Sequence, residues 1–362
     1  MSDFFEIDFL DVEAKKSGDA ITLRYRINGL TYIHVVDAGY ADTGDLVVSH
    51  VNKYYGAPPF IDHVVVTHQD RDHSGGIGKV LESFKVGTLW MLRPWSYAAE
   101  LLPRFARFSS PENLAARLKE IFPNIAALEE IAVKKQITIR EPFQGASIGA
   151  FTVMAPARER YLSLIVESDK TPQIAESAIK AAVATLFSNV AETVANIINS
   201  VWGEEKFSSE GAGAENETSV VQYATLCGKK ILLTGDAGRE GLEEAANYAP
   251  MVGLQLPGID RFQVPHHGSR RNVSTEILDR WLGQRLPAQP ASGQELFSAI
   301  ISAAKEDAHH PRKSVIRAMI HRGAKVVSTD THGNLIAQFR SPDRADYSSI
   351  TEGLPYPAGQ EE

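Results

Sequence analysis

Residues 64–78 read VVVTHQDRDHSGGIG, an apolar run that leads into two histidines and two aspartates within six positions. Four ionisable side chains this close together cannot all be buried unless a positive charge lies among them, because an unpaired buried charge is costly. Side chains alternate along an extended backbone, so residues 68, 70 and 72 would project to one side and His73 to another. The stretch predicts a buried strand that ends in a metal site, with a solvated polar loop as the alternative.

Two later stretches also run from a buried strand into residues of the metal-ligand type. KKILLTGD (229–236) ends at Asp236, and RFQVPHH (261–267) ends at His266 and His267. If the three strands are neighbours in one sheet, all three groups project from the same edge, where loops build active sites. A helix N-cap is the other interpretation of Asp236, because a helical pattern follows it. The convergence of the three stretches favours a common site.

The types of ligand in these stretches indicate which ions they could bind. Imidazole nitrogens and carboxylate oxygens are the usual protein ligands of zinc, and oxygen-rich sets shift the preference towards Mn²⁺ or Mg²⁺. The segment 68–73 is long enough to serve two ions, and a single carboxylate such as Asp236 could bridge them. The residues therefore predict two divalent metal ions, zinc or manganese, with magnesium as a further candidate.

The composition describes an ordinary globular protein. The chain has 362 residues, of which 43% are hydrophobic and 23% charged, so one large or two ordinary domains are expected. The formal net charge of -8 argues against a globally basic nucleic-acid binder. A single cysteine, Cys227, rules out an intrachain disulfide and suits a reducing compartment. With no signal-peptide pattern and no apolar stretch of roughly 20 residues, we expect a cytoplasmic protein without a membrane partner.

Strand-like and helical patterns alternate along most of the chain. Strands are expected at 4–12, 20–27, 31–39, 61–68, 86–92, 136–143, 149–156, 219–227, 229–237, 261–269, 324–334 and 335–340, and helices at 45–56, 76–84, 109–122, 241–249 and 313–323. Apolar residues at steps of three and four predict a long helix over 172–202. This helix would pack on the body of the protein, or form a lid, a homodimer interface or a surface for a partner protein. Residues 341–362 are polar without periodicity, which predicts a loose tail.

The motif at 67–76, THQDRDHSGG, resembles the signature of the metallo-β-lactamase fold hydrolases, whose usual form is His-x-His-x-Asp-His. Here Asp70 replaces the second histidine. This variant, followed in order by LLTGDAG, VPHHGS and STDTHGN, is similar to the lactamase-type domain of the ComEC family of DNA-uptake proteins and their soluble stand-alone relatives. The resemblance implies an α/β fold, the four-layer αββα sandwich, over residues 1–340. It leaves helical insertions near 96–135 and 160–210.

The resemblance also implies a role for each site residue. One ion would be bound by His68 and Asp70, the other by Asp72 and His73, with Asp236 as the bridge. His267 would be a further ligand, and His266 would face the substrate. A third histidine on the first ion, present in many family members, is missing. That position reads ENETS, so Asn216 or water would complete the site, which we expect to bind its ion more weakly.

Hydroxide generated between two ions would attack phosphorus or a carbonyl carbon. We expect Asp72, His266 and Asp236 to be catalytic and a further set to contact the substrate, namely Asn216, Ser269, Arg270 and His332. Phosphate esters are favoured for two reasons. Asp70 adds an oxygen ligand to the first site, which suits phosphate-bound Mn²⁺ or Mg²⁺, and arginines follow the histidine pair. These arginines could equally be solvated surface charges. The leading hypothesis is a phosphodiesterase or nuclease acting on DNA, RNA or a nucleotide.

Two other classes of function remain open from the sequence. One is a hydrolase of another ester or an amide. The other is a non-catalytic, metal-bound recognition component of a multiprotein system, which the missing third histidine and the long helix would suit. Turnover on a phosphate ester distinguishes the first hypothesis from both.

Overall fold

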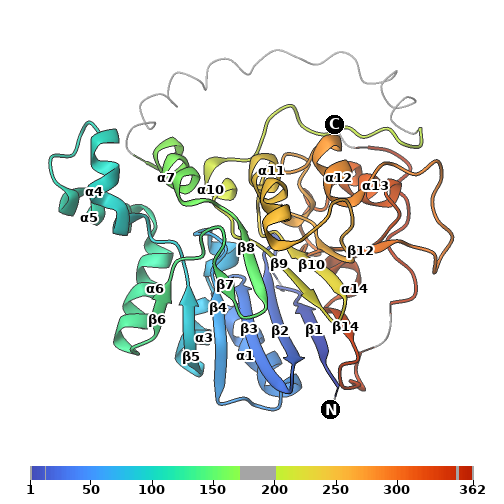
Figure 1. The fold of residues 1–362 in the computed structure, drawn as a ribbon, viewed down its shortest axis with the longest axis horizontal. Coiled ribbons are helices and arrows are strands. Elements are labelled where there is room, and N and C mark those ends of the chain that lie inside the picture. The colour runs from blue at the N-terminus through green and yellow to red at the C-terminus, as the bar shows by residue number, and fades with distance from the viewer. Residues whose placement is uncertain (1, 13, 172–200, 348–349, 361–362) are drawn as a thin grey trace.

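The computed structural model describes residues 2–12, 14–171, 201–347 and 350–360 (Figure 1). Its centre is built from two seven-stranded sheets. The first sheet has the strand order β14 (Leu335–Phe339), β1 (Phe4–Phe9), β2 (Ala20–Ile27), β3 (Leu30–Ala38), β4 (Phe60–Val65), β5 (Lys85–Trp90) and β6 (Thr138–Arg140). Pairing is antiparallel from β14 to β3 and parallel from β3 to β6.

The second sheet also joins an antiparallel half to a parallel half. Its order is β13 (Ala324–Ser328), β12 (Phe297–Ile301), β11 (Arg261–Gln263), β10 (Lys229–Leu233), β9 (Val221–Leu226), β8 (Phe151–Ala155) and β7 (Ser147–Ile148). Pairing is parallel from β13 to β10 and antiparallel from β10 to β7. The strands β4, β10 and β11 that precede the predicted ligands all lie in the parallel halves.

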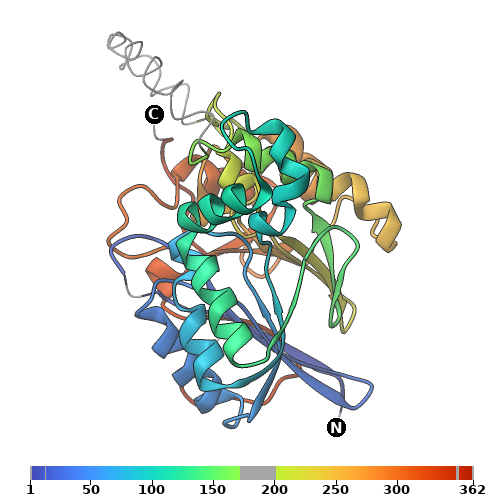
Figure 2. The same ribbon diagram turned by 90° about the vertical axis from the view of Figure 1, so that its left-hand side faces the viewer.

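The inner faces of the two sheets pack against each other, and helices cover the outer faces (Figure 2). One buried cluster joins Phe5 and Ile7 of the first sheet to Phe151, Ile231 and Ile300 of the second. Two further clusters lie outside the sheets, one with α1 (Thr43–Tyr54), α3 (Ile77–Ser83), α5 (Pro111–Ile121), α6 (Pro123–Lys134) and α7 (Arg158–Glu167), the other with α11 (Arg239–Tyr248), α12 (Thr275–Leu282) and α13 (Lys313–His321). The predicted four-layer αββα sandwich is therefore confirmed.

Local sequence signals predicted most elements but not all. The helix α5 begins as expected, with Pro111 at its first position and the Ser110 hydroxyl accepting a hydrogen bond from the Asn113 N–H. Helix α12 and strand β12 were not predicted, because they are short and β12 follows a polar, proline-rich loop. Residues 329–332, expected as strand, form the single helical turn α14. The predicted helix at 172–202 lies almost wholly outside the described residues.

The tail differs from the prediction. The Arg344 guanidinium forms ion pairs with the buried carboxylates of Glu6, at 2.9 Å, and Asp8, at 2.6 Å. Further on, the Leu354 N–H donates to the Val326 carbonyl at 2.7 Å. The prediction of a loose tail is thus wrong for the described residues 341–347 and 350–360, because polar contacts without helical or strand periodicity anchor it. Among the described residues, no helix has the length and apolar character needed to cross a lipid bilayer.

A second buried ion pair lies on the outer side of the second sheet. The Arg322 guanidinium and the Thr275 hydroxyl donate to the Glu205 carboxylate, at 2.5 and 2.8 Å, and the His321 ring lies 3.0 Å from it. Burial alone would raise the pKa of Glu205, but the hydrogen bonds from His321 and Arg322 outweigh it and lower the pKa to about 2. The carboxylate therefore stabilises the fold in its charged form.

We expect this ion pair to contribute acid-sensitive stability. A carboxylate whose pKa is lower in the folded chain than in the unfolded chain, about 4.3, stabilises the fold above that value, and its contribution is lost as the pH falls towards the folded pKa. Glu205→Gln should lower the free energy of unfolding by about 3 kcal/mol at neutral pH, and this difference should shrink by about 1 kcal/mol at pH 3.5. Chemical denaturation of both proteins at the two pH values measures it. A difference independent of pH would contradict the assignment.

Candidate metal centre

The three predicted ligand stretches meet at one end of the paired sheets. The chain leaves β4 and places His68 and Asp70 before the short turn α2 (Arg71–Ser74), Asp236 follows β10, and the two histidines 266–267 follow β11. The three strands are not neighbours in one sheet, because β4 belongs to the first sheet and β10 and β11 to the second. The ligands converge because the sheets pack face to face with these strand ends on the same side.

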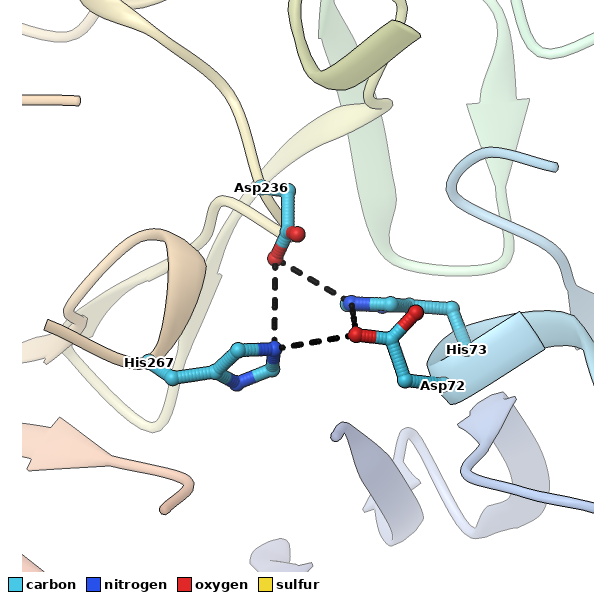
Figure 3. A group of neighbouring side chains, drawn as sticks. All are labelled: Asp72, His73, Asp236 and His267. Atoms are coloured by element: carbon cyan, nitrogen blue, oxygen red, sulfur yellow. Dashed lines mark ion pairs between the residues drawn. The ribbon is translucent and has the colours of Figure 1, made fainter. Parts of the chain in front are cut away.

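Four of the predicted ligands form a compact group (Figure 3). One ligand atom from each of Asp72, His73, Asp236 and His267 lies within 4.8 Å of the others. The Asp236 Oδ1 atom is 3.1 Å from His73 Nε2 and 3.9 Å from His267 Nε2, and His267 Nε2 is 3.5 Å from Asp72 Oδ2. Asp72 and His73 are the residues predicted for the second ion, Asp236 is the predicted bridge, and His267 is the predicted further ligand.

The residues predicted for the first ion lie on the other side of Asp236. The His68 Nε2 atom is 3.7 Å from Asp236 Oδ2 and 3.8 Å from Asp70 Oδ2. The other oxygen of Asp70, Oδ1, accepts a hydrogen bond from the Lys170 ammonium at 2.7 Å. Lys170 was not predicted, because it lies far from Asp70 in the sequence and carries no local motif. Its positive charge lies at the rim of the first group.

The donor atoms fit divalent metal ions. Four buried atoms of the cluster make no hydrogen bond within the described part of the chain, namely His68 Nε2, His73 Nε2, His267 Nε2 and Asp236 Oδ1. Leaving such groups unsatisfied costs about 1–3 kcal/mol each, so a buried cluster of them indicates a binding site for a cation. All four atoms point into the cluster, and all are of the type that binds zinc or manganese.

The opposite ring nitrogen of each histidine is held by a neighbour. The His73 Nδ1 atom is 2.7 Å from Asp37 Oδ2, the His267 Nδ1 atom is 2.9 Å from the Ser302 carbonyl, and the His68 Nδ1 atom is 3.2 Å from the Thr67 hydroxyl. A carboxylate or carbonyl at Nδ1 keeps the proton there and leaves Nε2 as a lone pair, which is how metal-binding histidines are oriented. His73 and His267 are therefore set up to bind through Nε2.

The charges in the cluster attract positive charge. Burial alone would raise the pKa of Asp236, but the neighbouring rings of His266, His73 and His267 lower it well below its ordinary value. In return, burial would lower the pKa of His267, but Asp236 and Asp72 raise it to about 9. The cluster thus stabilises cations at its centre, which is the electrostatic requirement for a metal site.

Asp37 is a functional residue that the sequence did not single out. It lies near the C-terminal end of β3 and has a left-handed backbone, with φ of 57°. Its carboxylate accepts hydrogen bonds from the Thr67 N–H and hydroxyl and contacts His73. The motif HVVDAG offers no metal-ligand pattern around it. Its position behind His73 makes it an orienting residue for the second ion.

We expect Asp37→Asn to weaken metal binding about 10–100-fold, because loss of a carboxylate behind a ligand histidine has effects of this size. Asparagine tolerates a left-handed backbone, so the loop should keep its conformation. Titration of the metal-free protein with Zn²⁺ against a competing chelator measures the affinity. Asp62→Asn is the matched control, since Asp62 also holds a backbone N–H, that of Ile33, but lies away from the cluster. Equal affinities in both variants would contradict the role of Asp37.

The predicted substrate contacts are only partly brought together. Asn216, in α10 (Ala214–Glu217), reaches His266, with its amide nitrogen 2.9 Å from His266 Nδ1. Ser269 is buried directly after the histidine pair, and the carbonyl of Arg270 accepts hydrogen bonds from Ser208 and Arg239.

His332 lies elsewhere. It lines a separate cavity of about 520 Å³, together with Tyr54, Arg261 and Asp346. The turn before Gly333 directs its ring back to the Ser328 carbonyl, 3.0 Å from Nδ1. His332 is therefore not part of the proposed site.

Comparisons with known proteins agree with this architecture. Residues 30–142 match the family model described as the metallo-beta-lactamase superfamily. A stretch of 138 residues, 38% of this chain, is 29% identical to ComE operon protein 3 of Bacillus subtilis (strain 168), and it spans only 15% of that relative.

The comparison with solved structures gives matches that are distant in sequence. The hydrolase AbOPH of the beta lactamase superfamily is 15% identical, with a TM-score of 0.29 over 60% of this chain and 56% of its own. A metallo beta lactamase from Hirschia baltica is 10% identical, with a TM-score of 0.27 over 68% of this chain and 82% of its own. The family model thus matches the part of the chain that carries His68, Asp70, Asp72 and His73, and this part, residues 30–142, is similar to the metallo-beta-lactamase superfamily.

Proposed function

We propose that the protein is a phosphodiesterase or nuclease that works with two divalent metal ions, zinc or manganese, with magnesium as a further candidate. The observation that carries this is the position of Asp236, whose two carboxylate oxygens face separate groups of histidine and aspartate side chains. A pair of ions held by such a bridge is suited to in-line displacement at phosphorus. The proposed ligands are His68, Asp70, Asp72, His73, Asp236 and His267.

The class of substrate is supported by charge at the rim of the site. Lys170 places an ammonium group beside Asp70, and its side chain is 46% exposed, so it is accessible to an anion. Asn216 lies at the same side of Asp236 and offers an amide to a phosphate oxygen. The resemblance to the lactamase-type domain of DNA-uptake proteins favours a nucleic acid or nucleotide over other phosphate esters.

In this proposal, the bound ions and the residues around them have separate roles in the reaction. Bound ions would supply hydroxide near neutral pH and polarise the substrate. Asp37 and the Ser302 carbonyl hold the rings of His73 and His267 in place. Asp72 has a side chain that is 26% exposed, against 3% for Asp236, so it forms the boundary between the buried cluster and the incoming substrate.

The test joins metal content to turnover. Elemental analysis of the purified protein should give about two ions per chain, and added Mn²⁺ should support cleavage of bis(p-nitrophenyl) phosphate and of labelled DNA. Asp72→Ala should remove this cleavage, while Asp45→Ala, at an exposed ion pair with Lys79, should not. If DNA is the substrate, the rate should fall steeply with salt.

Two outcomes would favour the other classes of function. Turnover on a carboxylic ester or an amide, with none on phosphate esters, would indicate a different hydrolase. Bound metal without turnover on any ester or amide would indicate a recognition component. An interface through residues 172–202 stays a prediction, since this segment lies outside the described residues.

A further inference from the structure

We propose that the cavity of about 520 Å³ lined by Arg261, Lys325 and His332 binds a small organic phosphate, an anion that joins a phosphate group to an apolar or ring-containing part. The cavity is separate from the metal centre, because the proposed metal ligands are not among the described residues that line it. Its volume falls within the range of small-molecule sites, about 300–1,000 Å³. The inference does not depend on the proposed reaction.

Three neighbouring strands of the second sheet form one wall of this cavity. Arg261 of β11 pairs in register with Ser298 of β12, and Ser298 pairs with Lys325 of β13. Register partners project from the same face of a sheet. Ile300, two residues after Ser298, packs between the two sheets, so its neighbours in this row also face the first sheet. We call Arg261, Ser298 and Lys325 the polar row.

The polar row carries two positive charges that have only neutral acceptors. The Arg261 guanidinium donates to the Asp260 carbonyl at 2.9 Å, and the Lys325 ammonium donates to the Ile350 carbonyl. Neither cation forms an ion pair with a residue that the structure describes. Burial lowers the pKa of Arg261, because its charge is partly removed from water. An anion in the cavity would restore what both cations lose by burial.

The carboxylates nearest to the polar row already have cations of their own. The carboxylate of Asp260 is 3.0 Å from the Lys229 ammonium. Asp346, which lines the cavity, accepts hydrogen bonds from the Lys53 ammonium at 2.5 Å and the Tyr54 hydroxyl at 2.7 Å. The charge that remains to attract a ligand is therefore positive.

The spacing of the polar row suits a single phosphate group. Neighbouring strands lie about 4.7–4.9 Å apart, so the Cα atoms of Arg261 and Lys325 are separated by roughly 10 Å, with Ser298 between them. Both long side chains can reach a group that lies over Ser298. The guanidinium offers paired N–H donors to phosphate oxygens, the ammonium adds a compact charge, and the serine hydroxyl adds a third donor.

An apolar part of the lining adjoins the polar row and indicates an organic ligand. It consists of aliphatic side chains from both sheets, namely Ile300, Val327, Leu335 and Ala337. Tyr54 and Tyr347 add two rings, whose centroids are 5.3 Å apart. Inorganic phosphate would leave this surface uncovered, whereas a phosphate ester would place its apolar or ring-containing part there.

Isothermal titration calorimetry of the full chain tests the site with three probes, AMP, adenosine and inorganic phosphate. Arg261→Gln and Lys325→Gln each remove one cation of the polar row. Ser298→Leu fills the cavity without removing a charge, and it keeps the backbone N–H that donates to the Asp260 carbonyl at 3.0 Å. Lys79→Gln is the matched control, since it removes an exposed cation of α3 away from the cavity.

We expect AMP to bind the wild type at least about 10-fold more tightly than adenosine or inorganic phosphate does, because only AMP uses both parts of the lining. Arg261→Gln and Lys325→Gln should each weaken AMP binding about 10–100-fold through the loss of a charge-assisted hydrogen bond. Ser298→Leu should weaken it by at least as much. Lys79→Gln should bind AMP as the wild type does, and so should Asp72→Ala, which alters the metal centre alone.

Circular dichroism shows which variants are folded, and any folded variant of the polar row is sufficient for the test. AMP affinity that is unchanged in such a variant would overturn the proposal. Loss of AMP binding in Asp72→Ala would also overturn it, since the metal centre would then be the AMP site. Equal affinities for AMP and inorganic phosphate, or no binding of either at millimolar concentration, would reject an organic phosphate in this cavity.

Discussion

Asp236→Asn is expected to lose both metal ions and to lower kcat on phosphate esters by at least about 10³-fold. The size follows from the several kcal/mol of transition-state stabilisation that metal ions supply, at 1.36 kcal/mol for each factor of ten. Asp236 is the residue that faces both groups of ligands, so its amide variant weakens two sites at once. Elemental analysis and steady-state kinetics on bis(p-nitrophenyl) phosphate measure the two losses.

The fold should survive this change. Asp236 lies after the end of β10, and its backbone N–H is held by the Ser219 hydroxyl, which asparagine leaves in place. The variant leaves the His73 and His267 rings without the carboxylate that they face, so thermal stability without metal should fall, while the far-ultraviolet circular dichroism should stay that of the wild type. Asp45→Asn is the control for the loss of one negative charge at an exposed position. Two retained ions in Asp236→Asn would refute the bridging role.

Arg344→Met is expected to lower the free energy of unfolding by about 3–5 kcal/mol, the range found when one partner of a buried ion pair is removed. Its guanidinium lies between Glu6 and Asp8, whose side chains are fully buried in the first sheet. Burial raises the pKa of Glu6, and the positive charge of Arg344 opposes this rise. The variant would therefore leave two buried carboxylates with less positive charge beside them. The guanidinium also lies over the Tyr54 and Tyr347 rings, 4.5 and 5.1 Å from their centroids, and methionine fills part of this space without the charge.

Chemical denaturation of Arg344→Met beside Arg340→Met separates this effect from a general loss of charge. Arg340 is exposed and lies over the Phe339 ring, so its replacement should change the free energy of unfolding by no more than about 0.5 kcal/mol. Denaturation midpoints that coincide for the two variants would show that the anchored tail does not stabilise the protein.

Much of the candidate site could be predicted because its ligands follow strands directly. His68, Asp236 and His267 each follow an apolar run, so residue type and local pattern together indicated a metal site at the ends of the strands. The pattern could not show that β4 lies in one sheet and β10 in the other, because the packing of two sheets leaves no local signal.

The supporting residues could not be predicted for a related reason. Asp37 and Lys170 act through contacts that only tertiary structure creates, and each has the appearance of an ordinary polar residue in the sequence. The left-handed backbone of His266 and His267 is likewise unusual at non-glycine positions, and no propensity scale anticipates it. The prediction of a loose tail for residues 341–362 failed because the polar contacts that hold its described part leave no periodic pattern in the sequence.

The pairing of β1 with β14 has a consequence for how the protein is made. Phe5 lies opposite Phe339, so the first sheet is completed only after almost the whole described chain has been brought together. Contacts between such distant positions slow folding, and the free edge of β1 meanwhile exposes unpaired backbone groups that another chain can pair with. Refolding yield should consequently fall as protein concentration rises, even where the native protein stays dissolved, and dilution or slow synthesis should favour the native state.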